Sequence, residues 1–448
     1  MKKIILIALI LFAVKSTANT FEVDGLHYVI IDGEAVVINP ALDDEQVGGD
    51  WFEGTYIEKA STYTGEINIP SVVTYEGKAY TVTGIGREAF LRCDESVSVK
   101  IPETVKRIGM CAFSYSYISS LTIPNSVEKI GWAACCEMFN LREIVFPEKL
   151  DTIPDRMLQF SRIHGWKSPL VSVKMPKEVK YIDRGAFAGL TNLEYISLPE
   201  GLKYIGEGAF TGNNKMVAEL PASVSYIGAN AFHITKAPTN TSLPDSLRTL
   251  EPEAFRAAKG LTQMSISGYI TNIPDYCFAA CSNITSLELN DNIENIGKFA
   301  FDGLRALKIV ILPASLKSMG KYAFSQCSNL RTVYALMKTP CTLGDYAFGG
   351  GETDYPNPSD ATLYVPTGCK SAYEAAGWGK YFAQIIEMEE TEQKAAFAKA
   401  LTGISTVKAG AEVTPSGWYD LQGRRLTEPR KGVNIIRYND GTARKVLK

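Results

Sequence analysis

The amino-acid sequence predicts a β-rich solenoid, in which about twelve similar units of 22–24 residues stack into one elongated core with parallel strands and short helical turns. Two observations predict this fold class. The phrase "LPEGLKYIGEGAF" at residues 198–210 returns as "LPASVSYIGANAF" at residues 220–232, and related phrases recur through most of the chain. In most units a proline also lies eleven residues before the last aromatic residue, at a position that ends a strand.

Aligning the repeats on their last aromatic residue defines twelve units. The aligned positions are 22–24 residues apart, except for 29 residues between Leu158 and Phe187, where the segment "SRIHGWKSP" adds length and should form a bulging loop. These positions are Phe90, Phe113, Cys135, Leu158, Phe187, Phe210, Phe232, Phe255, Phe278, Phe301, Phe324 and Phe348.

Each unit should begin with a strand that ends at the proline position. Segments such as "REIVF" at residues 142–146 and "YISL" at residues 195–198 alternate apolar and polar residues, as a half-buried strand does. A second apolar column follows three residues after the proline, so the chain turns back and fills the interior again. The glycine of "IG" offers a permissive backbone, and the remaining segment is long enough for only one short helical turn that drives alanine and phenylalanine inward.

A unit of this size cannot bury its own hydrophobic face, so the units must stack. Parallel strands about 4.8 Å apart would make twelve units span roughly 55–60 Å around one continuous core. The repeated phrase therefore encodes shape, and its apolar, proline and glycine residues are structural.

The two ends of the chain differ from the repeats. Residues 19–66 alternate around an Asp-Gly turn in "FEVDGLHYVIIDGEAVVIN", which predicts a β-hairpin cap for the first open edge of the stack. We place the solenoid at residues 67–387 and a helix running into a linker at residues 388–415, where aromatic residues become rare. Residues 416–448 should form a small C-terminal β module with turns at 422–423 and 439–441. Solvated strand faces or a polyanion contact would explain its excess of basic residues.

Residues 1–18 have the pattern of a secretory signal peptide. Lys2 and Lys3 precede an apolar run from Ile4 to Val14, and the small residues Ser16 and Ala18 stand at the −3 and −1 positions of a cleavage site. The run is too short to span a bilayer comfortably. We therefore expect an extracytoplasmic protein without a transmembrane segment after signal removal, either on the cell surface or secreted, with the periplasm as the alternative.

Charge and motifs argue against several classes of function. A formal net charge of −3 and a pI near 5.9 do not indicate a nucleic-acid partner. His27, His164 and His233 are the three histidines and lie in distant parts of the chain, and no HExxH, GxSxG, Walker-type or Cys/His metal-binding motif occurs. We predict a protein that is not an enzyme and that uses no cofactor and no metal.

Five of the nine cysteines occupy recurring positions within the repeats, which favours a structural role over a separate disulfide framework. Cys93, Cys281 and Cys327 each lie three residues after an aligned aromatic residue, and Cys111 and Cys277 lie just before one. Cysteine behaves as a small buried hydrophobic residue in such positions. The sequence therefore favours buried thiols, with disulfides as the alternative for an exported chain.

The phrase "LTIPNSVEKIG" at residues 121–131 and its relatives resemble the BspA-like leucine-rich repeat family of bacterial surface proteins. The resemblance covers about residues 67–387, including the ending "LYVPTGCKSAYEAAGWGKYFAQIIE", in which a strand is followed by a short helix. Ser267 and Asn290 in place of proline, and Cys135 and Leu158 in place of phenylalanine, depart from the pattern locally. The resemblance implies an exported leucine-rich repeat protein, often an adhesin or host-interaction factor, without shared catalytic residues. The C-terminal module is similar to β modules of exported proteins of the same bacterial group, some of which are sorting signals.

The outward-facing positions suggest where a ligand would bind. Positions two residues before the proline are mixed and mostly small, without a row of aromatic residues or a field of one charge sign. Six residues before the aligned aromatic, Tyr181, Tyr204 and Tyr226 occupy consecutive units and should form a ladder of rings about 10 Å long. Such a ladder suits stacking on sugar rings or gripping a peptide, or it serves only to stabilise neighbouring strands.

These features predict an exported, non-enzymatic, monomeric binding protein. We expect a cell-surface adhesin or host-interaction protein that contacts a host or matrix protein through the solenoid surface. The alternative is a glycan-binding accessory protein that uses Tyr181, Tyr204 and Tyr226.

Overall fold

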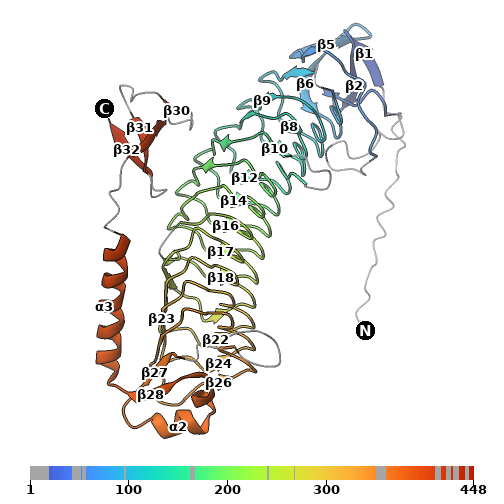
Figure 1. Ribbon diagram of the computed structural model, residues 1–448. Helices are drawn as coiled ribbons and strands as arrows, with labels where there is room; N and C mark the ends of the chain where they lie inside the picture. Colours follow the sequence, from blue (N-terminus) through green and yellow to red (C-terminus); the bar gives the residue numbers. More distant parts are fainter. Residues whose placement is uncertain are drawn as a thin grey trace, which may run out of the picture.

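The repeats form one long, curved stack of coils, which Figure 1 shows from the side. This computed structural model describes residues 20–42, 52, 57–94, 97–161, 167–239, 242–266, 268–349, 360–408, 415–419, 425–426, 433–438 and 443–447. The predicted signal peptide, the two predicted turns of the C-terminal module and most of the predicted loop after residue 161 lie outside these residues. The predicted β-solenoid of about twelve parallel-stranded turns is confirmed.

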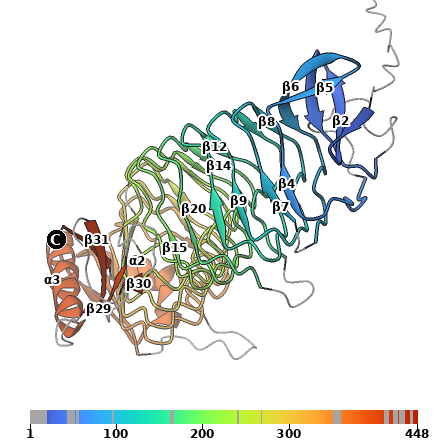
Figure 2. The same cartoon turned by 90° about the horizontal axis from the view of Figure 1, so that it is seen from above.

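The first strand of each coil runs up to the proline position, as predicted. These strands pair in parallel along the stack, and Figure 2 shows β4, β7 and β9 side by side. Isolated bridges join Tyr195 to Val217 and Ser242 to Ser265. The strands are β4 Glu66–Asn68, β7 Ser98–Lys100, β9 Ser120–Thr122, β11 Glu143–Val145, β13 Ser172–Val173, β15 Tyr195–Ile196, β19 Met264–Ile266, β21 Ser286–Leu289, β23 Ile309–Leu312, β25 Thr332–Ala335, β27 Thr362–Val365 and β28 Gln384–Glu387.

A second, shorter strand follows in each coil and begins at the column that contains the three predicted tyrosines. These strands also pair in parallel, because each coil repeats the backbone path of the coil before it. They are β8 Arg107–Ile108, β10 Lys129–Ile130, β12 Thr152–Ile153, β14 Tyr181–Ile182, β16 Tyr204–Ile205, β17 Tyr226–Ile227, β18 Thr249–Leu250, β20 Asn272–Ile273, β22 Asn295–Ile296, β24 Ser318–Met319 and β26 Thr342–Leu343.

The third side of each coil, which we call the turn face, is a run of hydrogen-bonded turns rather than the predicted helical turn. In one coil the amides of Gly208, Phe210 and Gly212 donate to carbonyls of the next coil at 2.8–2.9 Å. A helical turn would direct these amides to carbonyls of its own coil. Gly208 also has φ of +59°, and the equivalent residue of every coil has a positive φ, so bonding between coils replaces helix here.

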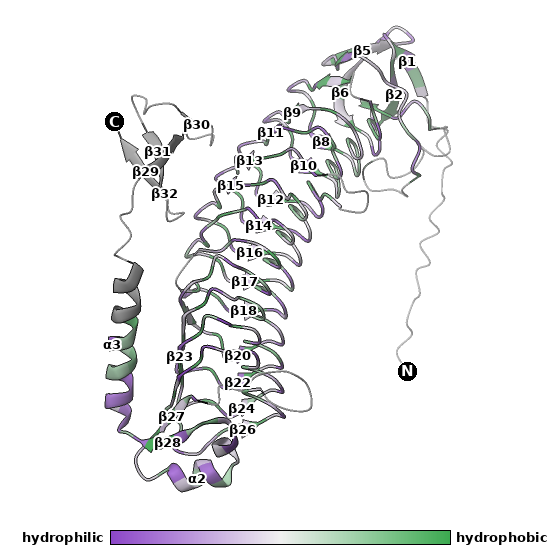
Figure 3. Cartoon of the chain, viewed as in Figure 1, coloured by the Kyte–Doolittle hydropathy of each residue, from purple (hydrophilic) through white to green (hydrophobic). Residues whose placement is uncertain are grey.

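The interior is one continuous hydrophobic core that follows the whole stack. All twelve aligned residues are buried, and the phenylalanine rings stack face to face, with Phe187 and Phe210 5.4 Å apart between ring centroids. Cys135 and Leu158 fill the same position in their coils and are also buried. Hydrophobic and hydrophilic residues alternate along the coils in Figure 3, as expected when one side of each strand faces this core.

An N-terminal cap covers the first coil. Its strands are β1 Thr20–Val23, β2 Leu26–Ile31, β3 Glu34–Val37, β5 Val72–Tyr75 and β6 Lys78–Ile85. The first three form an antiparallel meander, and β3 then pairs in parallel with β6, which pairs with β8. The cap therefore extends the ladder of second strands beyond the first coil, and the four-residue strand β1 becomes its edge.

Aromatic residues close the other end of the core. Helix α2 spans Lys370–Ala375 and the 3-10 helix η1 spans Trp378–Tyr381. Trp378, Tyr381 and Phe382 surround the ring of Phe348, with centroid distances of 5.0–5.7 Å. The last ring of the phenylalanine column is thus covered by side chains instead of another coil.

Helix α3, Glu390–Lys408, lies beside the first strands at the C-terminal end of the stack (Figure 1). Phe397 packs on Ile309, Ile311 and Tyr334, whose side chains point outward from β23 and β25. A separate antiparallel sheet follows, with strands β29 Pro415–Tyr419, β30 Arg425–Leu426, β31 Val433–Tyr438 and β32 Ala443–Leu447 in the order β30-β29-β31-β32. The domain boundaries remain a prediction.

All nine cysteines are free thiols, and eight of them are buried while Cys369 is half-buried. The Sγ atom of Cys281 donates to the carbonyl of Phe255 at 3.0 Å, so this thiol joins two coils. Burial raises the pKa of Cys281 and of Cys341 to about 12, which keeps both thiols protonated at neutral pH.

We therefore expect the folded protein to resist alkylation at its buried cysteines. Iodoacetamide at pH 8 should label Cys369 first, and all nine cysteines only after unfolding in denaturant, as read by mass spectrometry. Reducing and non-reducing gels should look alike. A fall in thermal stability on adding reductant would contradict the assignment of free thiols.

Candidate ligand-contact surface

The structure brings the three predicted tyrosines together on the ladder of second strands. Tyr181, Tyr204 and Tyr226 are register partners at the starts of β14, β16 and β17. The rings of Tyr204 and Tyr226 stack with centroids 4.5 Å apart and planes 13° apart, whereas Tyr181 is tilted by 47° at 6.4 Å from Tyr204. Tyr181 is 42% exposed and the other two are half-buried.

The stacking determines which parts of these rings a ligand could reach. Tyr204 and Tyr226 cover one face of each other, so a ligand would meet mainly ring edges and hydroxyl groups. Burial, the nearby Glu251 carboxylate and Tyr204 raise the pKa of Tyr226, which therefore stays a neutral hydrogen-bonding phenol. Tyr181 offers the most accessible ring of the three.

Polar residues continue the same column toward the C-terminal end of the stack, and they bond to one another. The Asn295 amide donates to Asn272 Oδ1 at 2.7 Å, and the Ser318 hydroxyl donates to Asn295 Oδ1 at 2.6 Å. These bonds join successive coils, so this part of the column stabilises the stack.

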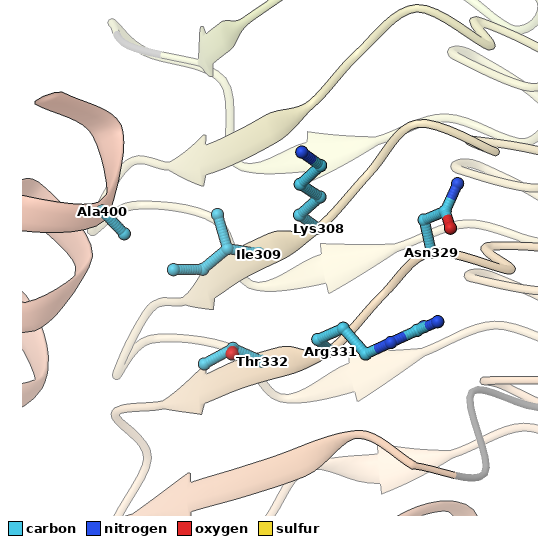
Figure 4. Close-up of a pocket in the computed structure, with 6 residues that line it drawn as sticks. All are labelled: Lys308, Ile309, Asn329, Arg331, Thr332 and Ala400. Atoms are coloured by element: carbon cyan, nitrogen blue, oxygen red, sulfur yellow. The ribbon is translucent and has the colours of Figure 1, made fainter. Parts of the chain in front are cut away.

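The outward face of the first strands is open over most of the stack but covered at its C-terminal end. Val145 on β11 is exposed, whereas Ile311 on β23 is buried beneath α3. Beside the helix lies an open hollow of about 430 Å³, lined by Lys308, Ile309, Asn329, Arg331, Thr332 and Ala400. Figure 4 shows that these side chains come from β23, β25, the segments just before them and α3, and that they do not converge on one point.

A second row of aromatic residues lies on the turn face, and the sequence analysis missed it. Tyr276, Phe299, Tyr322 and Tyr346 each lie two residues before an aligned phenylalanine, and we call them the turn-face ladder. Their rings stack in sequence with centroids 4.8, 5.0 and 5.2 Å apart. The signal was a column at this position, where aromatic residues fill the last four consecutive units.

The backbone makes the turn-face ladder unusual. All four residues have φ between +54° and +57°, a region that bulky side chains rarely adopt. Each such residue costs roughly 1–2 kcal/mol, while each stacked pair gains about 0.5–1.5 kcal/mol. Three stacked pairs therefore return less free energy than four left-handed residues cost, so ring stacking alone does not account for aromatic residues in this position.

Within the part of the chain that the structure describes, no group of three histidine, cysteine, aspartate or glutamate side chains is placed to hold a metal ion. Burial lowers the pKa of His233, and His164 lies outside the described residues. None of the described helices is long and apolar enough to cross a membrane.

Solved structures with the same architecture include a leucine-rich repeat protein from Bacteroides ovatus, with a TM-score of 0.50 and 20% identity over 82% of this chain and 100% of that one. A leucine rich cell surface protein from Faecalibacterium prausnitzii is similar with a TM-score of 0.37 and 18% identity, over 70% of this chain and 94% of that one. The pneumococcal vaccine antigen PcpA is similar with a TM-score of 0.38 and 15% identity, over 83% of this chain and 99% of that one. The likeness to the first protein shows a shared fold.

The repeats themselves match a family model. A search of curated proteins finds no match to the chain. The model described as "BspA type Leucine rich repeat region (6 copies)" matches residues 61–169, 164–267 and 249–353, which together exceed half of the chain. The chain belongs to the BspA type leucine-rich repeat family.

Proposed function

We propose that this chain is an exported, non-enzymatic binding protein of the bacterial cell surface that contacts a host or matrix protein through the outside of its solenoid. The observation that carries the proposal is the long outer surface of a rigid repeat scaffold. From β7 to β19 the outward positions of the first strands are mixed and solvent-facing, whereas Ser286 of β21 is buried and α3 packs on β23 and β25. A broad, mixed outer surface suits protein contact over a large area.

Export and surface location remain part of this proposal. The apolar run within residues 1–18 supports export, and membership of a repeat family of scaffold proteins supports binding rather than catalysis. The small β module after α3 would suit an attachment or sorting role, because it forms its own sheet apart from the repeat strands. A monomer remains our expectation, and no nucleic-acid partner is proposed because the net charge is only −3.

A second candidate function is glycan binding at Tyr181, Tyr204 and Tyr226. The exposed ring of Tyr181 favours it, because an accessible aromatic face is what a sugar ring stacks on. The mutual stacking of Tyr204 and Tyr226 reduces the ring surface that a glycan would reach. Protein contact is therefore the first proposal and glycan contact the second.

One experiment with two arms separates these functions. The purified chain without residues 1–18 is applied to a panel of immobilised extracellular matrix proteins and to a glycan array. We expect saturable binding to a matrix protein and no glycan signal. Selective glycan binding that Tyr204→Ala abolishes and Ser197→Ala preserves would instead establish the second candidate. If neither a matrix protein nor a glycan binds, both candidate functions are contradicted.

A further inference from the structure

We propose that the turn-face ladder of Tyr276, Phe299, Tyr322 and Tyr346 is a contact surface for an uncharged, apolar segment of a partner protein. This inference rests on the proposed protein-binding function and names the part of the solenoid that would carry it. It concerns a different face from the predicted tyrosines, because these four residues lie in the turns and not on the second strands.

The ladder lies outside a core that is already complete. In the same four coils, Phe278, Phe301, Phe324 and Phe348 form their own buried column with centroid distances of 4.9–5.6 Å. The turn-face rings run parallel to this column as a second row and remain partly accessible, with Tyr346 36% exposed. The protein therefore places aromatic surface in solvent where the fold does not need it to fill the interior.

Other coils show that the backbone position does not require an aromatic residue. The same left-handed position is occupied by Gly185, Gly208 and Asn230, which adopt positive φ at little cost. It is also occupied by Ala133 and Glu253, among others. The backbone of this position therefore does not require the four consecutive aromatic residues, and its left-handed conformation disfavours bulky side chains.

The rings are already ordered before any partner binds. Each ring is held by its neighbours at 4.8–5.2 Å, and the guanidinium of Arg256 lies 5.4 Å from the ring centroid of Tyr276. A partner that contacts rigid aromatic side chains loses little conformational entropy, which is why tyrosine and arginine are favoured at protein interfaces. The ladder combines both residue types on one rigid surface.

The charges around the ladder indicate an uncharged partner segment. Three cations and four carboxylates lie in or beside the turn-face positions of these coils, so their formal charges nearly cancel, and Arg256 pairs with Glu253 at 2.8 Å. Ring edges carry partial positive charge and the tyrosine hydroxyls donate hydrogen bonds, so the exposed ridge suits apolar groups interspersed with neutral acceptors such as backbone carbonyls. These residues are Arg256, Lys298, Lys321, Glu253, Asp275, Asp302 and Asp345.

Ring stacking argues for a polypeptide rather than a sugar. The inner rings of Phe299 and Tyr322 are covered by neighbours on both faces, and Arg256 lies over the free end at Tyr276. A glycan that needs flat ring faces therefore finds few, whereas a polypeptide can pack against ring edges.

The test selects ligands from a phage library that displays random dodecapeptides, panned on the chain without residues 1–18. Enriched peptides should be uncharged and apolar. Their binding should fall at least tenfold in the double variant Tyr276→Asn with Tyr322→Asn, because asparagine is the residue that the chain itself uses at position 230 in this slot. The control is Tyr269→Asn, which removes a tyrosine that is 62% exposed outside the ladder and should leave peptide binding unchanged.

Several outcomes would overturn the proposal. These are a failure to enrich peptides, enrichment of charged peptides, equal binding to the double variant, or a neutral glycan whose binding the double variant loses. Circular dichroism and melting temperature must match the parent protein, and if the double variant does not fold, Tyr346→Asn alone replaces it. A chain that binds a matrix protein without ladder-dependent peptides would keep the proposed function and refute the ladder. If peptides bind through the ladder but none of the matrix proteins binds, the ladder proposal stands and the proposed function is refuted.

Discussion

Replacing Phe210 with alanine should lower the free energy of unfolding by about 3–5 kcal/mol, because the substitution removes a buried ring and leaves a cavity. The ring has no exposed surface and stacks between Phe187 and Phe232 at 5.4 Å on each side. Three consecutive coils therefore lose packing at once. Chemical denaturation followed by circular dichroism measures the loss.

Ser197→Ala is the matched control for this prediction. Ser197 is exposed and follows β15 on the outer side of the stack, so its hydroxyl contributes little to folding. Equal unfolding free energies for the two variants would contradict the register in which position 210 faces the core.

Replacing Gly228 with alanine should also be strongly destabilising, at about 3 kcal/mol, the upper end of what overpacking usually costs. A Cβ atom at Gly228 would lie 2.6 Å from the backbone nitrogen of Glu207 in the preceding coil. Backbone cannot rotate away as a side chain does, so the two coils would have to separate. The corresponding glycines at positions 109, 131, 206, 297, 320 and 344 are equally crowded.

Gly201→Ala provides the comparison, because a Cβ atom there meets nothing within 4 Å and the residue is exposed. Its melting temperature should stay near that of the parent protein, while that of Gly228→Ala should fall by several degrees. If both substitutions are tolerated equally, close approach between coils is not what selects glycine at this position.

The close approach of neighbouring coils changes the interpretation of the "IG" glycine. The sequence suggested a residue chosen for a permissive backbone, yet Gly228 has an ordinary negative φ, as do its equivalents. Spacing along one chain cannot reveal how closely the next coil approaches, because that distance depends on how the coils stack. The structure therefore gives a steric reason where the sequence suggested a conformational one.

For the candidate contact surfaces too, the sequence predicted some features and only the structure showed others. The alignment placed Tyr181, Tyr204 and Tyr226 in consecutive units, and their register in the second strands follows from it. It did not predict that Tyr204 and Tyr226 would stack face to face, since ring orientation depends on rotamers and on neighbouring side chains. Likewise, nothing in the composition of residues 388–415 indicated that Phe397 would cover the outward side chains of β23 and β25.

The sequence by itself determined the repeat, its register and its buried columns, because the hydrophobic pattern of a solenoid unit is local and each coil contacts mainly its neighbours. That is why the twelve aligned positions and the five cysteines at recurring repeat positions could be assigned to the interior from spacing alone. Only the tertiary structure decided how the turn face bonds between coils, where α3 lies and which aromatic rings remain accessible. These features depend on distances between residues in different coils or beyond the repeats, and no local periodicity encodes such distances.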